Sequence, residues 1–185
     1  GRAVSHWHFR NKKDDKSVPT IGIDYMYMKP RKEGEASRED YVDGDEAGMP
    51  ILVIKDEHTK RISAHVVPEK GRNPHAIKVL RHEIENLGYK KLIIKSDQEP
   101  AIMALKESVK RERDEDIVLE ESPVGESASN GSIENAVRNV QGQVRSMRDA
   151  LETRYQIKIN GESSCIPWLV RHAANLVSRY QVGKD

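Results

Sequence analysis

Thr20-Ile21-Gly22-Ile23-Asp24-Tyr25-Met26-Tyr27-Met28 is the stretch that decides the fold of this chain. Its β-branched and aromatic residues predict a strand that is buried in a sheet. One carboxylate, that of Asp24, interrupts the apolar run, and the run contains no lysine or arginine to neutralise it. An ionised carboxylate is costly to bury unless it is paired, hydrogen-bonded or bound to a metal. Asp24 therefore marks this strand as part of a candidate site.

Two further acids stand in comparable positions. A second apolar run, 92–96, ends directly in Asp97, and Glu134 opens a predicted helix after Ser129-Asn130-Gly131. A single acid is ordinarily a solvent-exposed side chain. Three acids brought together raise one another's pKa, and a pair of divalent cations removes that conflict while creating a site for phosphate chemistry. The three acids together therefore indicate a metal site.

The order of three short motifs resembles the catalytic core of retroviral and retrotransposon integrases. These motifs are Ile23-Asp24-Tyr25, Ser96-Asp97-Gln98-Glu99-Pro100 and Ser129-Asn130-Gly131-Ser132-Ile133-Glu134. The integrase family carries Asp, Asp and Glu, and its spacing between the last two is close to that of Asp97 and Glu134, which enclose positions 98 to 133. The resemblance extends from about residue 19 to residue 180 and is nearest to integrases of retroelement polyproteins. It implies an α/β fold of the ribonuclease H-like type.

The resemblance also implies an activity and its machinery. Asp24, Asp97 and Glu134 would be the catalytic residues and the ligands of two Mg²⁺ or Mn²⁺ ions, with Asp24 bridging both ions, and no other cofactor is expected. The implied enzyme is a polynucleotidyl transferase and endonuclease. It would trim the 3′ ends of element DNA by hydrolysis and then join them to target DNA. DNA is the expected partner, and the chain is expected to form at least a homodimer.

The apolar patterns predict a mixed sheet of five strands with flanking helices. Asn73-Pro74 and Gly88 bound a helix whose apolar residues recur at spacings of three and four, and Pro100 opens a second helix that ends near residue 111. The predicted strands are 20–28, 51–55, 61–67, 92–96 and 117–119. Strands that come first and then alternate with helices favour an α/β layered fold.

A long helix is predicted from Ile133 onward, with Glu134 in its first turn, where the helix dipole favours a carboxylate. Its apolar stripe is Ile133, Val137, Val140, Val144, Met147 and Leu151. A polar stripe borders it, and we expect its members Arg138, Gln141, Arg145 and Arg148 to bind nucleic-acid phosphates. By resemblance, Ser129, Asn130 and Gly131 would bind DNA in a mobile loop, 122–131. A last helix, 167–180, is predicted to close the core and to contribute to a dimer interface. Its buried side is expected to consist of Trp168, Leu169, Ala173, Leu176 and Tyr180.

Composition suggests one catalytic core, 19–182, preceded by a polar linker, 1–18. An acidic insertion, 31–48, holds seven acids against three bases, whereas 135–185 holds eight bases against four acids. A basic helical face is a plausible phosphate-binding surface. The single cysteine favours a reducing compartment, nuclear or cytoplasmic, and no apolar run is long enough to cross a membrane. The first residue is not methionine, so we expect a segment cut from a longer polyprotein with flanking domains.

Other functions fit parts of the same pattern. A transposase or ribonuclease H shares the expected fold and metal chemistry, although ribonuclease H normally uses four acids. A catalytically silent nucleic-acid-binding module derived from an integrase would keep the fold without binding metal. A purely structural domain would leave Asp24 unexplained.

Overall fold

The computed structural model describes residues 18–27, 48–112, 116–121, 127–161 and 163–180, and the side chains of α3 from residue 130 onward. The strands are β1 (Thr20–Tyr27), β2 (Pro50–Asp56), β3 (Ile62–Val66), β4 (Lys91–Ser96) and β5 (Asp116–Glu121). The helices are α1 (Pro74–Leu87), α2 (Pro100–Arg111), α3 (Ser127–Tyr155) and α4 (Ile166–Tyr180). Three predicted segments lie outside the described residues. They are the linker except residue 18, the acidic insertion except residue 48, and loop residues 122–126.

The strands form one mixed sheet in the order β3-β2-β1-β4-β5. β1 pairs antiparallel with β2 and parallel with β4, β2 pairs antiparallel with β3, and β4 pairs parallel with β5. The predicted five-stranded mixed sheet is thus confirmed. β1 is its central strand, so the stretch that contains Asp24 lies in the middle of the fold.

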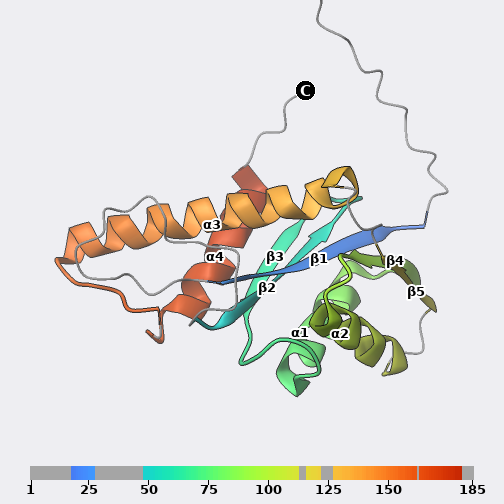
Figure 1. The fold of residues 1–185 in the computed structure, drawn as a ribbon. Coiled ribbons are helices and arrows are strands. Elements are labelled where there is room, and N and C mark those ends of the chain that lie inside the picture. Colours follow the sequence, from blue (N-terminus) through green and yellow to red (C-terminus); the bar gives the residue numbers. More distant parts are fainter. Residues whose placement is uncertain (1–17, 28–47, 113–115, 122–126, 162, 181–185) are drawn as a thin grey trace, which may run out of the picture.

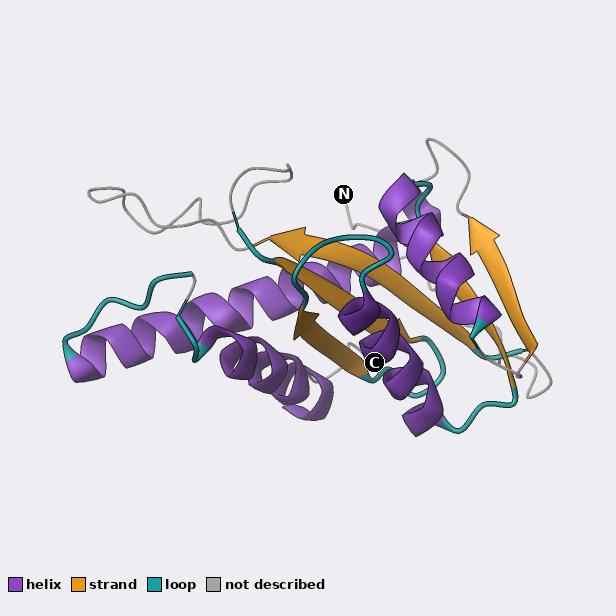
Figure 2. Cartoon of the chain, turned by 90° about the horizontal axis from the view of Figure 1, so that it is seen from below, coloured by secondary structure: helices purple, strands orange, loops and turns teal. Residues whose placement is uncertain are grey.

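Helices cover both faces of the sheet, with α3 and α4 on one side and α1 and α2 on the other (Figures 1 and 2). Side chains of β1 alternate between the two layers. Ile21, Ile23 and Tyr25 pack with α1 and α2, whereas Met26 packs with α3 and α4. Because a strand turns successive side chains to opposite faces, Gly22 and Asp24 belong to the α3 side.

The ends of α1 agree with the sequence prediction. Oδ1 of Asn73 accepts hydrogen bonds from the backbone N–H groups of His75, at 2.9 Å, and Ala76, at 3.3 Å. Gly88 ends the helix with φ 71°, the left-handed conformation that glycine adopts without strain. α2 also has the bounds that Pro100 predicted.

α3 begins earlier than expected. Residues 127–131, predicted as part of a mobile loop, form its first turns, so Glu134 lies about two turns inside the helix. The dipole effect fades within the first turn, so it does not act on Glu134 as predicted.

The buried side of α4 also differs from the prediction. Trp168 is 59% exposed and Tyr180 is 73% exposed, and Leu176 is only partly buried. The residues that face the core are Ile166, Leu169, Val170, Ala173, Ala174 and Val177. The helix is therefore rotated so that its two largest aromatic side chains face outward.

The outer edge of β3 is covered by α4. Oγ of Ser178 accepts a hydrogen bond from the Ile62 N–H at 2.7 Å and donates one to the Ile62 carbonyl at 2.8 Å. One hydroxyl therefore satisfies two backbone groups that an edge strand would otherwise leave open.

Candidate active site

The register of the sheet places two of the three predicted acids side by side. β1 and β4 run parallel, and their pairing ends with Gly22 opposite Lys95. Asp24 comes two residues after Gly22, and Asp97 comes two residues after Lys95. β4 ends at Ser96, so Asp97 is the first residue after it. Asp24 lies on the face of the sheet to which Gly22 belongs, and Asp97 follows β4 at the matching position of the register.

α3 lies across this same face. A Cβ atom added to Gly22 would stand 3.2 Å from Cβ of Ile133. A side chain at position 22 would make an unusually tight contact, so the absence of one at Gly22 allows the helix to come this close. α3 begins over the start of β1 and runs in the same direction (Figure 1).

The side on which Glu134 leaves the helix follows from its neighbours. Nζ of Lys55 donates a hydrogen bond to Oγ of Ser132 at 2.6 Å, and Lys55 belongs to β2. Successive residues of an α-helix are rotated by about 100°. With Ser132 directed toward β2 and Ile133 toward β1, Glu134 is directed toward β4. Glu134 therefore leaves α3 on the side where Asp97 follows β4.

Each carboxylate has a nearby partner of its own. Asp24 Oδ1 accepts the Tyr25 N–H at 2.7 Å, and Asp97 Oδ1 accepts the Glu99 N–H at 3.1 Å. Oε2 of Glu134, whose side chain is 45% exposed, lies 3.8 Å from Nη2 of Arg138.

Within the described ranges, no three Asp, Glu, His or Cys side chains are grouped so that they could hold a metal ion. Carboxylate oxygens are the ligands that Mg²⁺ prefers, so the type of donor at Asp24, Asp97 and Glu134 fits a magnesium site. Closing such a site requires the carboxylates to turn from their present partners toward one another.

The predicted nucleic-acid-binding residues fall into different environments. Arg138 is exposed, Gln141 and Arg145 are half-buried, and Asn130 and Gly131 lie half-buried in the first turns of α3. The side chain of Ser129 lies outside the described residues.

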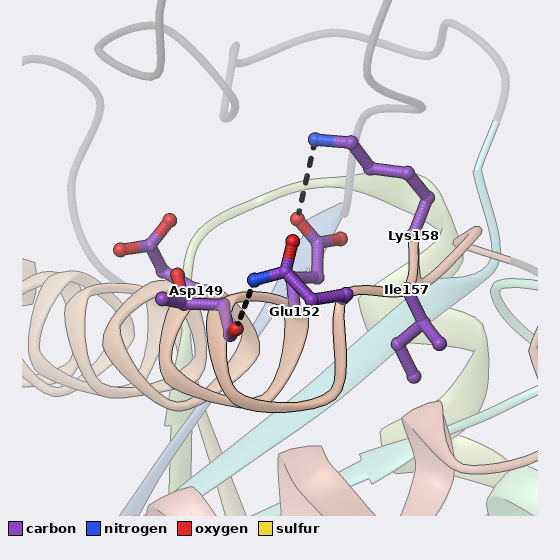
Figure 3. Close-up of a pocket in the computed structure, with 6 residues that line it drawn as sticks. Asp149, Glu152, Ile157 and Lys158 are labelled. Carbon is purple, nitrogen blue, oxygen red and sulfur yellow. Dashed lines mark hydrogen bonds and ion pairs between the residues drawn. The ribbon is translucent and has the colours of Figure 1, made fainter.

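Arg148 is buried, so it does not face a nucleic acid as predicted. Its Nε donates to Oε1 of Glu152 at 3.1 Å, and the same oxygen accepts the Ile159 N–H at 2.9 Å. Lys158 Nζ lies 4.0 Å from the other oxygen of Glu152 (Figure 3). A cavity of about 320 Å³ opens beside these groups, at the end of α3. Arg148 therefore anchors the chain that follows α3.

Lys106 is a buried cation beside the candidate site that the sequence analysis did not single out. It is 1% exposed and donates a hydrogen bond from Nζ to the Glu120 carbonyl at 3.0 Å. Burial lowers the pKa of Lys106, and the charges of Glu121, Asp97 and Glu120 oppose this shift. A signal was present in the sequence, because Lys106 follows Ile102 by four residues and falls on the apolar stripe of α2.

Lys70 is a second cation near the site. Its Nζ lies 2.7 Å from Oε1 of Glu99, which is two residues beyond Asp97, and 4.8 Å from the centre of the Tyr27 ring. Burial alone would lower the pKa of Lys70, but its hydrogen bonds to Glu99 and Tyr27 outweigh burial and raise the pKa. This contact ties the segment between β3 and α1 to the start of α2. No local sequence pattern predicts it, since the partners are far apart in the chain.

No family model matches the chain, and none of the curated proteins matches it. Solved structures do. The catalytic core domain of BIV integrase is 16% identical, with a TM-score of 0.52, and the match covers 89% of this chain and 86% of that one. The HTLV-2 integrase catalytic core domain in complex with magnesium, in a trimeric form, is 12% identical with a TM-score of 0.57, covering 89% and 88%.

A third match is to a simian T-cell lymphotropic virus intasome in complex with PP2A regulatory subunit B56 gamma. It is 14% identical with a TM-score of 0.58, and the match covers 89% of this chain but 50% of that one. At these identities the likeness shows the fold. The chain has the ribonuclease H-like fold of integrase catalytic cores, as its sequence motifs implied.

Proposed function

We propose that this chain is the catalytic core of a retroelement integrase, taken from a polyprotein, and that it joins element DNA to target DNA. The fold of integrase catalytic cores supports this proposal. The observation that carries it is the parallel register of β1 and β4, which, continued by two residues, pairs the position of Asp24 with that of Asp97. The close approach of α3 to Gly22 supports a place for Glu134 near these two acids.

In this proposal Asp24, Asp97 and Glu134 hold two Mg²⁺ or Mn²⁺ ions. When bound, such ions activate the attacking oxygen and stabilise the charge that develops on the leaving oxygen. Three carboxylates suffice, because Mg²⁺ keeps water molecules and shares oxygens of the substrate phosphate. The solved HTLV-2 core is a magnesium complex, which supports this choice of metal.

The chain's own residues have two tasks. The three carboxylates would hold the ions to which the reacting phosphodiester binds, and the exposed Arg138 neutralises a neighbouring phosphate without reading the base sequence. Trimming is attack of water on a phosphorus atom near the 3′ end, with departure of the 3′ oxygen of the preceding nucleotide. In joining, the freed 3′-hydroxyl attacks a phosphodiester of the target, so one P–O bond forms as another breaks.

The test is a joining assay with a labelled element-end duplex and a target duplex, in Mg²⁺ or Mn²⁺. We expect Asp97→Asn and Glu134→Gln to reduce joining by at least about 100-fold, because each removes a negative charge from the metal site. Glu107→Gln is the matched control, since Glu107 is exposed on α2 and pairs with Arg72 at 3.5 Å. Equal joining by Asp97→Asn and wild type would contradict the proposal. Cleavage of an RNA/DNA hybrid without joining would instead indicate a ribonuclease H.

A second candidate is a catalytically silent nucleic-acid-binding module. The observation that favours it is that the described side chains include no ready-made metal group, since each of the three acids is turned to a nearby partner. Calorimetric titration with Mn²⁺ separates the two candidates. An integrase core gives a binding heat that Asp97→Asn abolishes, whereas a binding module gives the same trace for both proteins.

A further inference from the structure

A second polar cavity lies far from the three acids, at the outer edge of the sheet. Its volume is about 490 Å³, and its lining comes from β3, α1 and α4 and from the turn before β3. The size is in the range of small-molecule sites. β3 is separated from β1 by β2, so this cavity and the candidate active site belong to different parts of the molecule.

An ion-pair cluster around the buried carboxylate of Glu83 lines the cavity. Oε2 of Glu83 lies 3.0 Å from Nη2 of Arg61, and its Oε1 lies 2.9 Å from Nε2 of His65. Glu83 is 6% exposed, so its carboxylate is held in place by these two partners. Glu83 is the only acid among the residues that line the cavity.

The wall formed by α4 adds two arginines without adding an acid. Arg171, Asn175 and Arg179 are spaced by four residues, so they follow one face of α4, and all three line the cavity and are exposed. In the part of the chain that the structure describes, no carboxylate forms an ion pair with Arg171 or Arg179. The lining therefore carries three guanidinium groups against one carboxylate, and two of the guanidinium groups are uncommitted within the described residues.

β3 contributes backbone to the cavity wall but no exposed donor at Ile62 or Ala64. The N–H and the carbonyl of Ile62 face away from β2 and both bond to Oγ of Ser178. Ala64 lines the cavity but is 0% exposed, so its backbone is covered. The groups that can bind an anion here are therefore the arginine side chains.

We propose that this cavity binds an anion that carries two or more phosphate groups. Guanidinium groups bind phosphate through paired hydrogen bonds, which makes arginine a strong phosphate ligand. The backbones of Arg171 and Arg179 are about 12 Å apart along α4, because each residue advances the helix by about 1.5 Å. A linear polyphosphate or two adjacent nucleic-acid phosphates can set one phosphate at each arginine, whereas a single phosphate has to share its oxygens between both.

Titration calorimetry with tripolyphosphate, on the full chain in metal-free buffer, tests the proposal. We expect Arg171→Ala and Arg179→Ala each to weaken binding by at least about tenfold, since each removes one charged hydrogen-bonding partner. Inorganic phosphate should bind more weakly than tripolyphosphate by a similar factor. Arg111→Ala is the matched control, because Arg111 is exposed on α2 and removes the same charge elsewhere. Its affinity for tripolyphosphate should equal that of wild type.

Three results would overturn the proposal: no binding of tripolyphosphate, unchanged affinity in both α4 variants, or an equal loss in Arg111→Ala. Competition with a short DNA duplex distinguishes the two sources of phosphate. Displacement of tripolyphosphate by the duplex assigns the cavity to the nucleic-acid backbone, and retention assigns it to a free polyphosphate. Asp97→Asn should bind tripolyphosphate as wild type does, so the outcome is independent of the proposed integrase activity.

Discussion

Gly22 is the residue at which the sheet and α3 come closest. Its missing side chain leaves room for Ile133, and a Cβ atom there would approach Cβ of Ile133 to 3.2 Å. We predict that Gly22→Ala lowers the free energy of unfolding by about 1–3 kcal/mol, the usual cost of overpacking a core. Because the added methyl group displaces α3, it should also reduce DNA joining. Urea denaturation and the joining assay measure the two effects.

Gly142→Ala provides the control for this substitution. Gly142 lies in α3, and a Cβ atom added there meets nothing within 4 Å. Alanine is the better helix former by up to about 1 kcal/mol, so Gly142→Ala should stabilise the chain. A loss of stability in Gly142→Ala as large as that in Gly22→Ala would show that contact with Ile133 is not the cause.

The sequence could identify the acids but not the directions of their side chains. Asp24 is recognisable because a charge within an apolar strand needs an explanation, and Asp97 because it ends the next buried run. Their side-by-side placement depends on the parallel register, which no local pattern contains. Arg148 was predicted to be exposed because its neighbours on the stripe are polar. Its burial depends on Ile159, which returns to the same carboxylate of Glu152 from beyond the helix.

Among the connections between elements, the turn from β2 to β3 depends on one buried acid. Asp56 is 1% exposed, and its carboxylate accepts hydrogen bonds from the N–H groups of His58 and Thr59, from the Thr59 hydroxyl, and from the Tyr89 hydroxyl at 2.8 Å. Burial alone would raise the pKa of Asp56, but the hydrogen bonds from Thr59, Tyr89 and His58 outweigh burial and lower the pKa. Burial and the hydrogen bond to Asp56 raise the pKa of Tyr89 to about 12.

We predict that Asp56→Asn destabilises the chain by about 2 kcal/mol near neutral pH, because an amide cannot accept all of these hydrogen bonds. A carboxylate with a lowered folded-state pKa stabilises the fold above its unfolded pKa, here the ordinary value of 3.8, and loses that contribution as the pH falls through the folded-state pKa. The difference between wild type and Asp56→Asn should therefore shrink as the pH falls below 3.8. Denaturation curves between neutral and acidic pH measure this. A constant difference would contradict the assignment.

Boundaries of helices were predictable where a strong local signal stands at the end. Asn73, Pro74 and Gly88 define α1 because their backbone and side-chain preferences act locally. The start of α3 was missed, since Ser127 to Gly131 are small residues that are typical of loops. For α4 the predicted stripe was displaced from the real one. Trp168 was predicted on the buried side, whereas its neighbours Ile166 and Val170 are the residues that are buried.

For the molecule as a whole, the exposed N-terminal part of α4, around Trp168 and His172, is a candidate contact between copies of the chain, apart from the C-terminal part that lines the second cavity with Arg179. The Trp168 ring stacks on His172 with the ring centres 4.9 Å apart, and Trp168 is 59% exposed. Large aromatic side chains at the surface are enriched at protein interfaces. We predict that wild type sediments as a dimer at micromolar concentration and that Trp168→Ala weakens the dimer by at least about tenfold.

Tyr155→Ala is the control in sedimentation velocity, because Tyr155 has the same exposed fraction, 59%, at the end of α3. If both variants sediment as wild type does, α4 is not the interface. None of the described helices combines the length and apolar content needed to cross a membrane.

The two margins of the sheet have a consequence for the behaviour of the purified chain. At β3, one hydroxyl of α4 occupies the outward backbone groups of Ile62. At β5, the acids Asp116, Glu120 and Glu121 are exposed beside Val118, which is itself 41% exposed. Asp116 and Glu120 pair with Lys91 and Lys95 of β4, so this edge carries charged side chains along its length. Strand-to-strand stacking into fibrils is thus opposed by a blocked template on one side and by charged side chains on the other. Neutralising the acids with low pH should make β5 the margin at which such fibrils start.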